Sequence, residues 1–159
     1  MTKESIKTYS YRISQASRTD LVVIVYDMAM EYLDNEIKAI DNNNQEEARK
    51  EQKLALRCID QLLVTLEMNS EISVRLHLIY NHIKRSVVNA GISHDTAELQ
   101  RVIGLLQKLR TSFYEISSQD ESGPLMKNTQ QVYAGLTYSN GGYSNENLSD
   151  PVENRGYKA

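Results

Sequence analysis

The chain is poor in the residues that interrupt helices. It has two prolines and seven glycines in 159 residues, and both prolines and five of the glycines come after residue 117. Between residues 19 and 116 there is no proline, and Gly91 and Gly104 are the only glycines. Strands would need turn residues about every 8–12 positions. This stretch without breakers favours helices, and we predict an all-α fold.

Cysteine, strong net charge and long apolar runs are also lacking. Cys58 is the only cysteine, which excludes a disulfide framework, and its apolar neighbours mark it as a small buried hydrophobe. The net charge is −3, whereas nucleic-acid-binding domains usually carry a basic face. No apolar run reaches the roughly 20 residues that span a bilayer, and no signal-peptide core is visible. We therefore expect a cytoplasmic protein that neither inserts into membranes nor binds nucleic acid.

The chain does contain helix caps and apolar periodicity. Ser17, with Asp20 three residues later, forms an acidic version of the capping box. It begins a predicted helix that ends near residue 41. A second helix is predicted over about residues 45–68, where apolar residues recur on one side.

A third and a fourth helix follow in the same way. The third is predicted over about residues 70–90, with Gly91 as its C-terminal cap. The fourth begins at Asp95 and has Glu98 at the capping-box position. Because loops of about 3–6 residues join these long helices, neighbours should run antiparallel. We predict an up-down four-helix bundle over residues 17–117.

Segments of different composition flank this bundle. We expect residues 1–16, which carry apolar and tyrosine side chains, to fold over the first helix as an N-terminal lid. Residues 118–159 are rich in Ser, Asn, Gly and Tyr and poor in aliphatic residues. We predict a polar, largely disordered tail there, in which only QQVYAGLTY has enough apolar character to dock.

Catalytic and metal-binding patterns are missing. None of His77, His82 and His94 has a Glu three residues before it, so the Glu-x-x-His pairs of a di-iron bundle are excluded. Phosphate-binding loops, Cys-x-x-Cys pairs and nucleophile elbows are absent as well. We expect no enzyme, no cofactor and no metal. A histidine phosphotransfer-type signalling bundle stays as an alternative, in which His77 or His82 would have to carry the phosphate.

The first helix has more apolar surface than a bundle core needs. Its opening stretch LVVIV, residues 21–25, resembles a buried strand by itself but follows a helix cap. At 100° per residue the apolar side chains of this helix cover about 200°, against little more than about 100° for an ordinary surface helix. Val22 and Val25 can face the core, whereas Val23 and Ile24 fall outside even this wide arc. Those two side chains need a cover.

Other apolar residues lie beside the main stripes of the second and third helices, namely Leu63 and Val64 on one and Val74 and Leu78 on the other. Apolar patches of roughly a few hundred Å² mark partner sites. The usual partner of a groove between helices is another amphipathic helix. Two alternatives stay open: the flanking segments of the chain cover this surface, or two copies pair through it as a structural helical dimer.

A covering segment is available ahead of the first helix. It contains Ile6, Tyr9, Tyr11 and Ile13. Tyrosines suit a reversible lid because each combines apolar area with a polar tip that tolerates water. We expect Tyr9 or Tyr11 to lie on Val23 and Ile24. Such a lid must be displaced before a partner binds, which lowers the apparent affinity.

Taken in order, these segments resemble FliS, the family of flagellin-specific export chaperones. QASRTDLVVIVYD, residues 15–27, is similar to the family's capped aliphatic run that closes in Tyr-Asp, with Arg18 in place of a proline. LLVTLEMNSEI resembles the turn between the second and third helices, and LHLIYNHIKR resembles the family's Leu-x-x-Leu-Tyr motif. DTAELQRVIGLLQKLRTSF resembles the closing helix, with Phe113 where tryptophan is common. The likeness covers about residues 9–117.

The resemblance implies a cytoplasmic four-helix bundle that binds the disordered C-terminal segment of flagellin. Binding would prevent premature polymerisation and assist delivery to the cytoplasmic domain of the flagellar type III export gate. In this family the segment before the first helix can cover the flagellin groove. With helical geometry added, the predicted groove and lid residues are Ile6, Tyr9, Tyr11, Ile13, Val23, Ile24, Tyr26, Leu63, Val64, Val74 and Leu78. The sequence leaves open whether the lid inhibits or assists binding, and whether the chain is a homodimer.

Overall fold

The computed structural model describes residues 1–68 and 70–126, and its regular elements there are α-helices throughout. Their bounds are α1 Lys3–Gln15, α2 Arg18–Asp41, α3 Gln45–Val64, α4 Glu71–Ser93 and α5 Thr96–Ser117. The all-α class predicted from the shortage of proline and glycine is confirmed for this part of the chain. Most of the predicted tail, residues 127–159, lies outside the described residues.

The capping box predicted at the start of α2 is present. The hydroxyl oxygen of Ser17 accepts the backbone N–H of Asp20 at 3.2 Å, and the Asp20 carboxylate accepts the backbone N–H of Ser17 at 3.1 Å. These two bonds satisfy N–H groups that have no partner within the first turn. The β-branched run that follows is helical because the cap and the residues beyond it outweigh its local strand preference.

One apolar core is shared by α2, α3, α4 and α5. Its buried members are Tyr26, Ala29 and Leu33 from α2, Ala55, Cys58, Ile59 and Leu62 from α3, Tyr80, Ile83, Val87 and Ala90 from α4, and Leu99, Val102 and Leu106 from α5. The hydroxyls of Tyr26 and Tyr80 bond to each other, so neither is left unpaired. Cys58 is buried as predicted, and burial raises its pKa to about 11.

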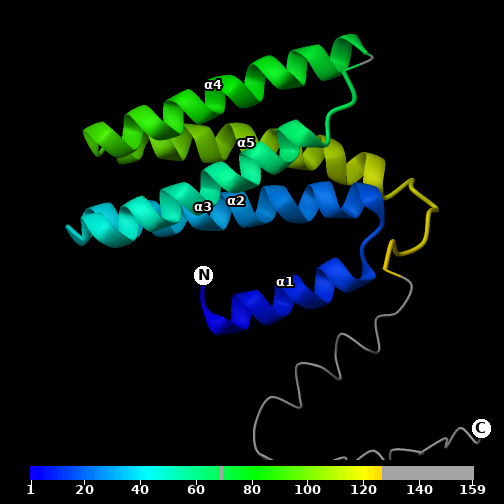
Figure 1. Ribbon diagram of the computed structural model, residues 1–159, viewed down its shortest axis with the longest axis horizontal. Coiled ribbons are helices and arrows are strands. Elements are labelled where there is room, and N and C mark those ends of the chain that lie inside the picture. The colour runs from blue at the N-terminus through cyan, green and yellow to red at the C-terminus, as the bar shows by residue number, and fades with distance from the viewer. Residues whose placement is uncertain (69, 127–159) are drawn as a thin grey trace, which may run out of the picture. The chain divides into compact units, whose positions relative to one another are not determined.

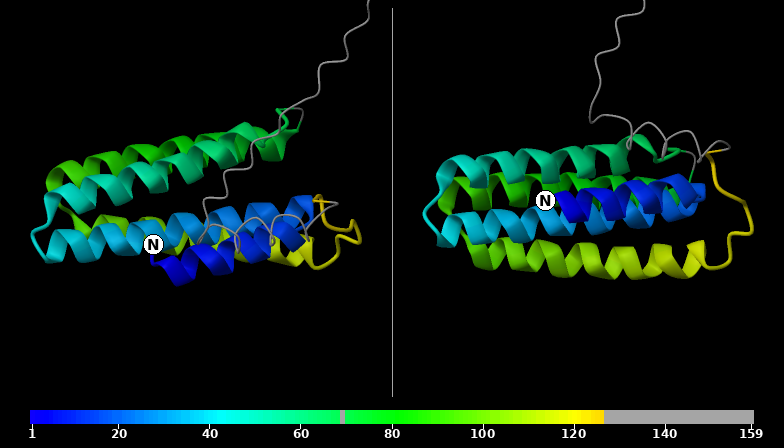
Figure 2. Two further views of the ribbon diagram at one scale, coloured as in Figure 1. Left: turned by 60° about the horizontal axis from the view of Figure 1, so that its bottom comes forward. Right: turned by 90° about the horizontal axis from the view of Figure 1, so that it is seen from below.

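The helices divide into a core-forming group and one covering helix. α2 packs against α3 and α5, and α4 packs against the same two helices from the other side. α1 lies along α2, on the side away from α4 (Figures 1 and 2). Toward the end where α2 begins, α3 and α4 diverge from α2 and α5 (Figure 2, left).

Two helix ends differ from the prediction. α3 ends at Val64, four residues before the expected position. α4 continues through Gly91, and the left-handed residue that follows it is His94, with φ 56° and ψ 34°. Gly91 is therefore not the cap that its residue type suggests. An added Cβ there would lie 1.8 Å from Nε2 of Gln52 on α3, so the close approach of the two helices accounts for the glycine.

The N-terminal segment, expected only as a lid, is itself helical. Thr2 caps α1 by accepting the backbone N–H of Ser5 at 3.1 Å. Within α1, Ser14 is the only buried residue. A helix of 13 residues is marginal alone in water. The helical state of α1 therefore depends on its contact with α2.

Candidate binding surface

The outer face of α2, which is turned away from the core, carries Ile24, Asp27 and Glu31 at helical spacing. Ile24 and its neighbour Val23 are only 3% exposed, yet neither belongs to the shared core. α1 lies along this side of α2 (Figure 2, right). α1 is therefore placed to cover these apolar residues.

An ion-pair network on the outer face joins three helices. Asp27 lies between two guanidinium groups: Arg12 of α1 donates from Nη2 to Oδ2 at 2.7 Å, and Arg110 of α5 donates from Nε to Oδ1 at 2.9 Å. The Asp27 side chain is 16% exposed, so both bonds are partly shielded from water. The guanidinium of Arg12 also lies 5.6 Å from the ring centroid of Tyr9. Arg12 therefore holds α1 in one register on α2.

Tyr9 lies near the carboxylates of the outer face. Burial, together with the neighbouring Glu31, raises the pKa of the Tyr9 hydroxyl. Arg12 pairs with Asp27, and Tyr9, three residues earlier in α1, bonds to Glu31, four residues later in α2. Of the two tyrosines expected on Val23 and Ile24, Tyr9 does not fit this register, since it lies further along α2 beside Glu31, and the placement of Tyr11 there stays a prediction.

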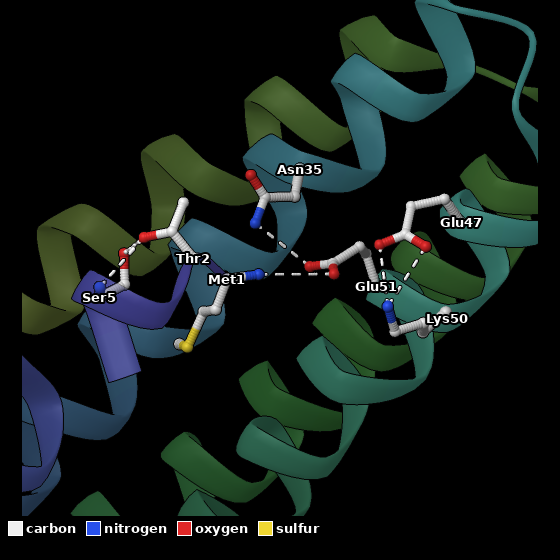
Figure 3. A network of polar contacts seen from close by, with 7 residues as sticks. All are labelled: Met1, Thr2, Ser5, Asn35, Glu47, Lys50 and Glu51. Atoms are coloured by element: carbon white, nitrogen blue, oxygen red, sulfur yellow. Dashed lines mark hydrogen bonds and ion pairs between the residues drawn. The ribbon is translucent and has the colours of Figure 1, made fainter. Parts of the chain in front are cut away.

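Figure 3 shows how the beginning of α1 is attached. The amino group of Met1 lies 3.6 Å from Oε1 of Glu51 on α3, and the two side chains are 6% and 3% exposed. Asn35 of α2 donates from Nδ2 to the other oxygen of this carboxylate at 3.2 Å. Glu51 thus connects the start of α1 with both α2 and α3.

Residues 118–126 fall within the predicted tail, but they bind back to the junction between α1 and α2. The backbone N–H of Leu125 donates to the carbonyl of Ala16 at 3.1 Å. The hydroxyl of Thr19 donates to the carboxylate of Asp120 at 2.7 Å. We call residues 118–126 the return segment. It ties the end of α5 to the hinge of the covering helix.

Asp20 is the centre of this junction. Its carboxylate accepts the hydroxyl of Ser117 at the end of α5 and the backbone N–H of Ser17. The bond from Ser117, followed by those from Ser17, lowers the pKa of Asp20. Bonds from Ser122 and Thr19 lower the pKa of Asp120 in the same way. Both carboxylates are therefore charged, hydrogen-bonded anchors at neutral pH.

An apolar cavity of about 350 Å³, here called the end cavity, is lined by residues of α2, α3, α4 and α5 and of the turn after α3. Its lining is Arg18, Leu21, Val22, Val25, Gln61, Leu62, Thr65, Leu66, Tyr80 and Phe113. Apolar groups dominate, and three polar side chains are available to orient a bound group. A cavity of this kind accepts bulky apolar side chains.

The predicted lid residues lie on α1 with different exposures. Ile6 and Tyr11 are 52% and 56% exposed, whereas Tyr9 and Ile13 are half-buried. Tyr26 needs a correction: its side chain has no exposed area and belongs to the core. It falls on the inner side of α2, where it bonds to α4, and so it is not a groove residue.

The other predicted groove residues do not join the outer face of α2. Leu63 packs against the core from α3, and Val64 is 78% exposed at the end of that helix. Val74 and Leu78 are 46% and 64% exposed on α4. Since α4 lies on the side of the core away from α1 (Figure 1), these two residues cannot share one groove with Val23.

Sequence reasoning missed the polar groups that position the covering helix. Arg12 and Arg110 are separated from Asp27 by 15 and 83 residues, and no local pattern indicates these pairings. Asp27 did offer a signal, because it is a carboxylate directly after an apolar run on the exposed side of the predicted helix. No sequence signal indicated the role of Glu51, because its partners are the amino group of Met1 and the side-chain amide of Asn35.

In the part of the chain that the structure describes, a helical core is flanked by an N-terminal helix that lies along α2, which defines a class of helical protein with a covering helix. The family model of the flagellar protein FliS matches residues 2–120, and the chain belongs to the FliS family. It is similar to the flagellar secretion chaperone FliS of Bacillus subtilis (strain 168), with 26% identity over 101 residues, which cover 64% of this chain and 76% of that protein. The resemblance seen in the sequence is confirmed.

Family membership decides between a chaperone and a histidine phosphotransfer protein. FliS is a family of chaperones and not of enzymes, which confirms the expectation of a protein without catalysis. The phosphotransfer alternative built on His77 or His82 therefore loses its support. Among the described residues, no helix combines the length and the apolar character that crossing a membrane requires.

Proposed function

We propose that this protein is a cytoplasmic secretion chaperone that binds the C-terminal segment of flagellin, prevents its premature polymerisation and delivers it to the cytoplasmic domain of the flagellar type III export gate. The observation that carries this proposal is the burial of Val23 and Ile24 outside the shared core. A chaperone needs an apolar surface that its substrate can occupy and that stays protected when the substrate is absent. Membership in the FliS family supports a flagellar substrate.

The covering helix is suited to reversible release. Ser14 is its only buried residue, and its contact with α2 includes the exchangeable ion pair of Arg12 with Asp27. Releasing α1 exposes little apolar area of its own, and water can solvate the separated charges. An amphipathic helix of flagellin would place apolar anchors at i, i+3, i+4 and i+7 on the same face.

The end cavity extends this binding surface. Val22 and Val25 line the end cavity, whereas Val23 and Ile24 are buried outside the shared core. The first turns of α2 therefore carry apolar groups toward both surfaces. In our proposal, an up-down four-helix arrangement of α2 to α5 holds these turns in place while α1 exchanges with flagellin, and a bulky side chain of flagellin enters the cavity.

Calorimetric titration tests the proposal with a peptide that copies the C-terminal helices of the same organism's flagellin. Binding is expected to the full chain, and more tightly to a variant that lacks residues 1–14, because α1 then no longer competes. Weaker binding after the deletion would show that α1 supplies contacts instead of blocking them. No binding to either protein at about 50 µM would contradict the flagellin proposal.

A pair of substitutions locates the site. Ile24→Glu places a charge on the outer face and should weaken peptide binding at least about tenfold. Ile92→Glu is the matched control, since Ile92 is 76% exposed on α4, away from α1, and it should leave the affinity unchanged. Circular dichroism confirms that both variants fold. Equal losses in both variants would place the flagellin site elsewhere.

Delivery is a separate step with its own measurement. The loaded chaperone, but not flagellin peptide alone, should bind the purified cytoplasmic domain of the export gate in a pull-down. If the loaded complex fails to bind, the delivery step is wrong even where flagellin binding is confirmed.

A further inference from the structure

The amino group of Met1 lies against a buried carboxylate of another helix. It is 3.6 Å from Oε1 of Glu51 on α3, and the side chains of the two residues are 6% and 3% exposed (Figure 3). Such a shielded ion pair is unusual for a terminal amino group, because chain termini usually lie at the surface. Since α1 begins at Lys3, this contact joins the start of the covering helix to α3.

Glu51 depends on this amino group for its charge partner. Asn35 of α2 donates from Nδ2 to Oε2 of Glu51 at 3.2 Å, which leaves Oε1 to Met1. Lys50, the neighbouring cation on α3, bonds to Glu47 instead. Within the part of the chain that the structure describes, the Met1 amino group is the one positive charge paired with Glu51. Breaking a buried pair by removing one partner is strongly unfavourable, because the other charge stays buried.

We infer that the Met1 amino group is a modification-sensitive site, which holds α1 closed only while Met1 is present and its amino group is free. We call this group, together with Glu51 and Asn35, the Met1 site. Bacterial chains are synthesised with a formyl group on this nitrogen. Hydrolysis of the formamide C–N bond by water releases formate and leaves the amino group, which takes up a proton. A second hydrolysis can break the peptide bond between Met1 and Thr2, which releases methionine and leaves a new amino group on Thr2.

The new amino group on Thr2 is not in a position to replace the one on Met1. Thr2 caps α1: its hydroxyl oxygen accepts the backbone N–H of Ser5 at 3.1 Å, and its carbonyl accepts the backbone N–H of Ile6 at 3.1 Å. These two bonds fix Thr2 at the start of the helix. Consecutive Cα atoms are about 3.8 Å apart. The amino group that remains after excision therefore lies about one residue farther from Glu51.

The charge on Met1 has opposite effects on α1 by itself and on the contact of α1 with α3. A positive charge at the N-terminus of a helix is unfavourable, because the helix dipole is positive at that end. Blocking the amino group removes this charge and would stabilise an isolated helix. In the folded protein, blocking would instead leave Glu51 without its cation and weaken the contact. The sign of the effect on α1 therefore distinguishes the two cases.

The Met1 site bears on the proposed function through α1. Because α1 lies along α2, loosening its first turn should make the outer face of α2 more accessible to flagellin. This consequence rests on the proposed function, whereas the closed state of α1 can be measured without flagellin.

Hydrogen exchange of three forms of the full chain tests the inference. One form begins with a free Met1 and a second begins at Thr2, each released from a cleavable fusion, and a third is the Met1 form acetylated by an N-terminal acetyltransferase. Amide exchange in α1 should be slowest with free Met1 and at least about tenfold faster in the other two forms, while core amides of α3 stay protected. Equal exchange in all three forms would overturn the inference. Slower exchange after acetylation, as the helix dipole alone predicts, would overturn it as well.

Glu51→Gln shows whether the effect of acetylation depends on this carboxylate. In this variant, acetylation of Met1 should change exchange in α1 by less than about twofold. Glu47→Gln is the matched control, because Glu47 also lies on α3 but bonds to Lys50. Acetylation should keep its full effect in that variant. An undiminished effect in Glu51→Gln would mean that another contact is responsible, which contradicts the Met1 site.

Titration with the flagellin peptide separates this inference from the proposed function. Where both are correct, the acetylated form should bind the peptide more tightly than the form with free Met1. Faster exchange in α1 with no peptide binding to any form would support the Met1 site and contradict the flagellin proposal. Unchanged exchange with normal peptide binding would refute the Met1 site alone.

Discussion

Gly91 and Gly104 both lie inside helices, but their surroundings differ. A Cβ at Gly91 would meet Gln52 and Glu36, whereas a Cβ at Gly104 would have no neighbour within 4 Å. Alanine normally stabilises a helix interior by about 0.5–1 kcal/mol relative to glycine. Where it must displace Gln52, which bonds to the carbonyl of Val87 at 3.0 Å, that gain is outweighed by lost contacts.

We therefore predict opposite effects of the same substitution. Gly104→Ala should raise the free energy of unfolding by about 0.5–1 kcal/mol. Gly91→Ala should lower it by about 1–2 kcal/mol, because the Gln52 side chain must move and give up its bond to the carbonyl of Val87. Urea denaturation of the two variants measures both values. Stabilisation by Gly91→Ala would show that Gln52 moves aside without loss.

Glu36 is a second residue whose surroundings set its effect on stability. Its side chain is 1% exposed, and its Oε2 has no hydrogen-bond partner. Burial raises the pKa of Glu36 to about 7, against a weaker opposing effect of Gln52. In the unfolded chain a glutamate titrates near pH 4.3. The folded state thus binds this proton more tightly, so stability is full below about pH 4 and is lost as the pH rises toward 7.

Replacing Glu36 with glutamine removes this titration. The advantage of Glu36→Gln over the wild type should grow by about 2 kcal/mol between pH 5 and pH 8, as the native carboxyl becomes ionised in its buried position. Urea denaturation at the two pH values measures the change. Glu46→Gln, at an exposed position, is the control and should show no such trend. An advantage that is the same at both pH values would mean that water or a counter-charge already compensates Glu36.

At the scale of elements, α1 is held by contacts of moderate strength. Its ion pair with Asp27 is partly shielded, and Asp27 keeps Arg110 when Arg12 is lost. Arg12→Ala should therefore release α1 without unfolding the rest. We expect amide exchange in α1 to accelerate about tenfold, which corresponds to about 1.4 kcal/mol, while core amides of α3 stay protected.

The control for this prediction is an exposed ion pair on the same protein. Arg18 pairs with Glu67 at 3.2 Å, but the side chains are 72% and 65% exposed. Pairs of this kind contribute little. Arg18→Ala should leave exchange in α1 unchanged. If exchange in α1 is equally slow in Arg12→Ala, the helix is held by other contacts, and its release by a partner becomes harder to explain.

The elements also show which parts of the fold a sequence can predict. Ser17 and Asp20 act within one helical turn, so their capping box could be recognised from local spacing alone. The end of α4 could not be recognised in this way. Gly91 is a glycine because α3 lies close to it, and the residue in the left-handed conformation is His94. Local patterns succeed where the cause is local. They fail where contact with a different helix determines the residue type.

The same distinction between local causes and contacts with distant residues applies to the binding surface. A surplus of apolar residues on one helix predicts that Val23 and Ile24 need a cover, and this depends only on helical periodicity. The register of that cover depends on Arg12 meeting Asp27, and the return segment depends on Leu125 meeting Ala16. These are contacts between distant parts of the chain. Their partners become visible only in the folded structure.

At the scale of the whole molecule, two kinds of carboxyl group have opposite effects on how the free energy of unfolding changes with pH. Asp20 and Asp120 have lowered pKa values because serine and threonine hydroxyls bond to them at the end of α5. A lowered pKa contributes stability that is present above the unfolded value of about 3.9 and is lost as the pH falls through the folded value. Glu36 acts in the opposite direction above about pH 4.

The free energy of unfolding should therefore pass through a maximum near about pH 5. Below this pH the carboxylates of Asp20 and Asp120 become protonated at the junction of α1, α2 and the return segment. Above this pH the buried Glu36 ionises. Denaturation from about pH 2.5 to pH 8 measures the profile. Asp20→Asn should flatten the acid limb and Glu36→Gln the alkaline limb, each without altering the other, because the two groups lie at opposite ends of α2. A wild-type profile that rises steadily to pH 8 would contradict this balance, and with it the assignment of Glu36 as an unpaired buried carboxyl.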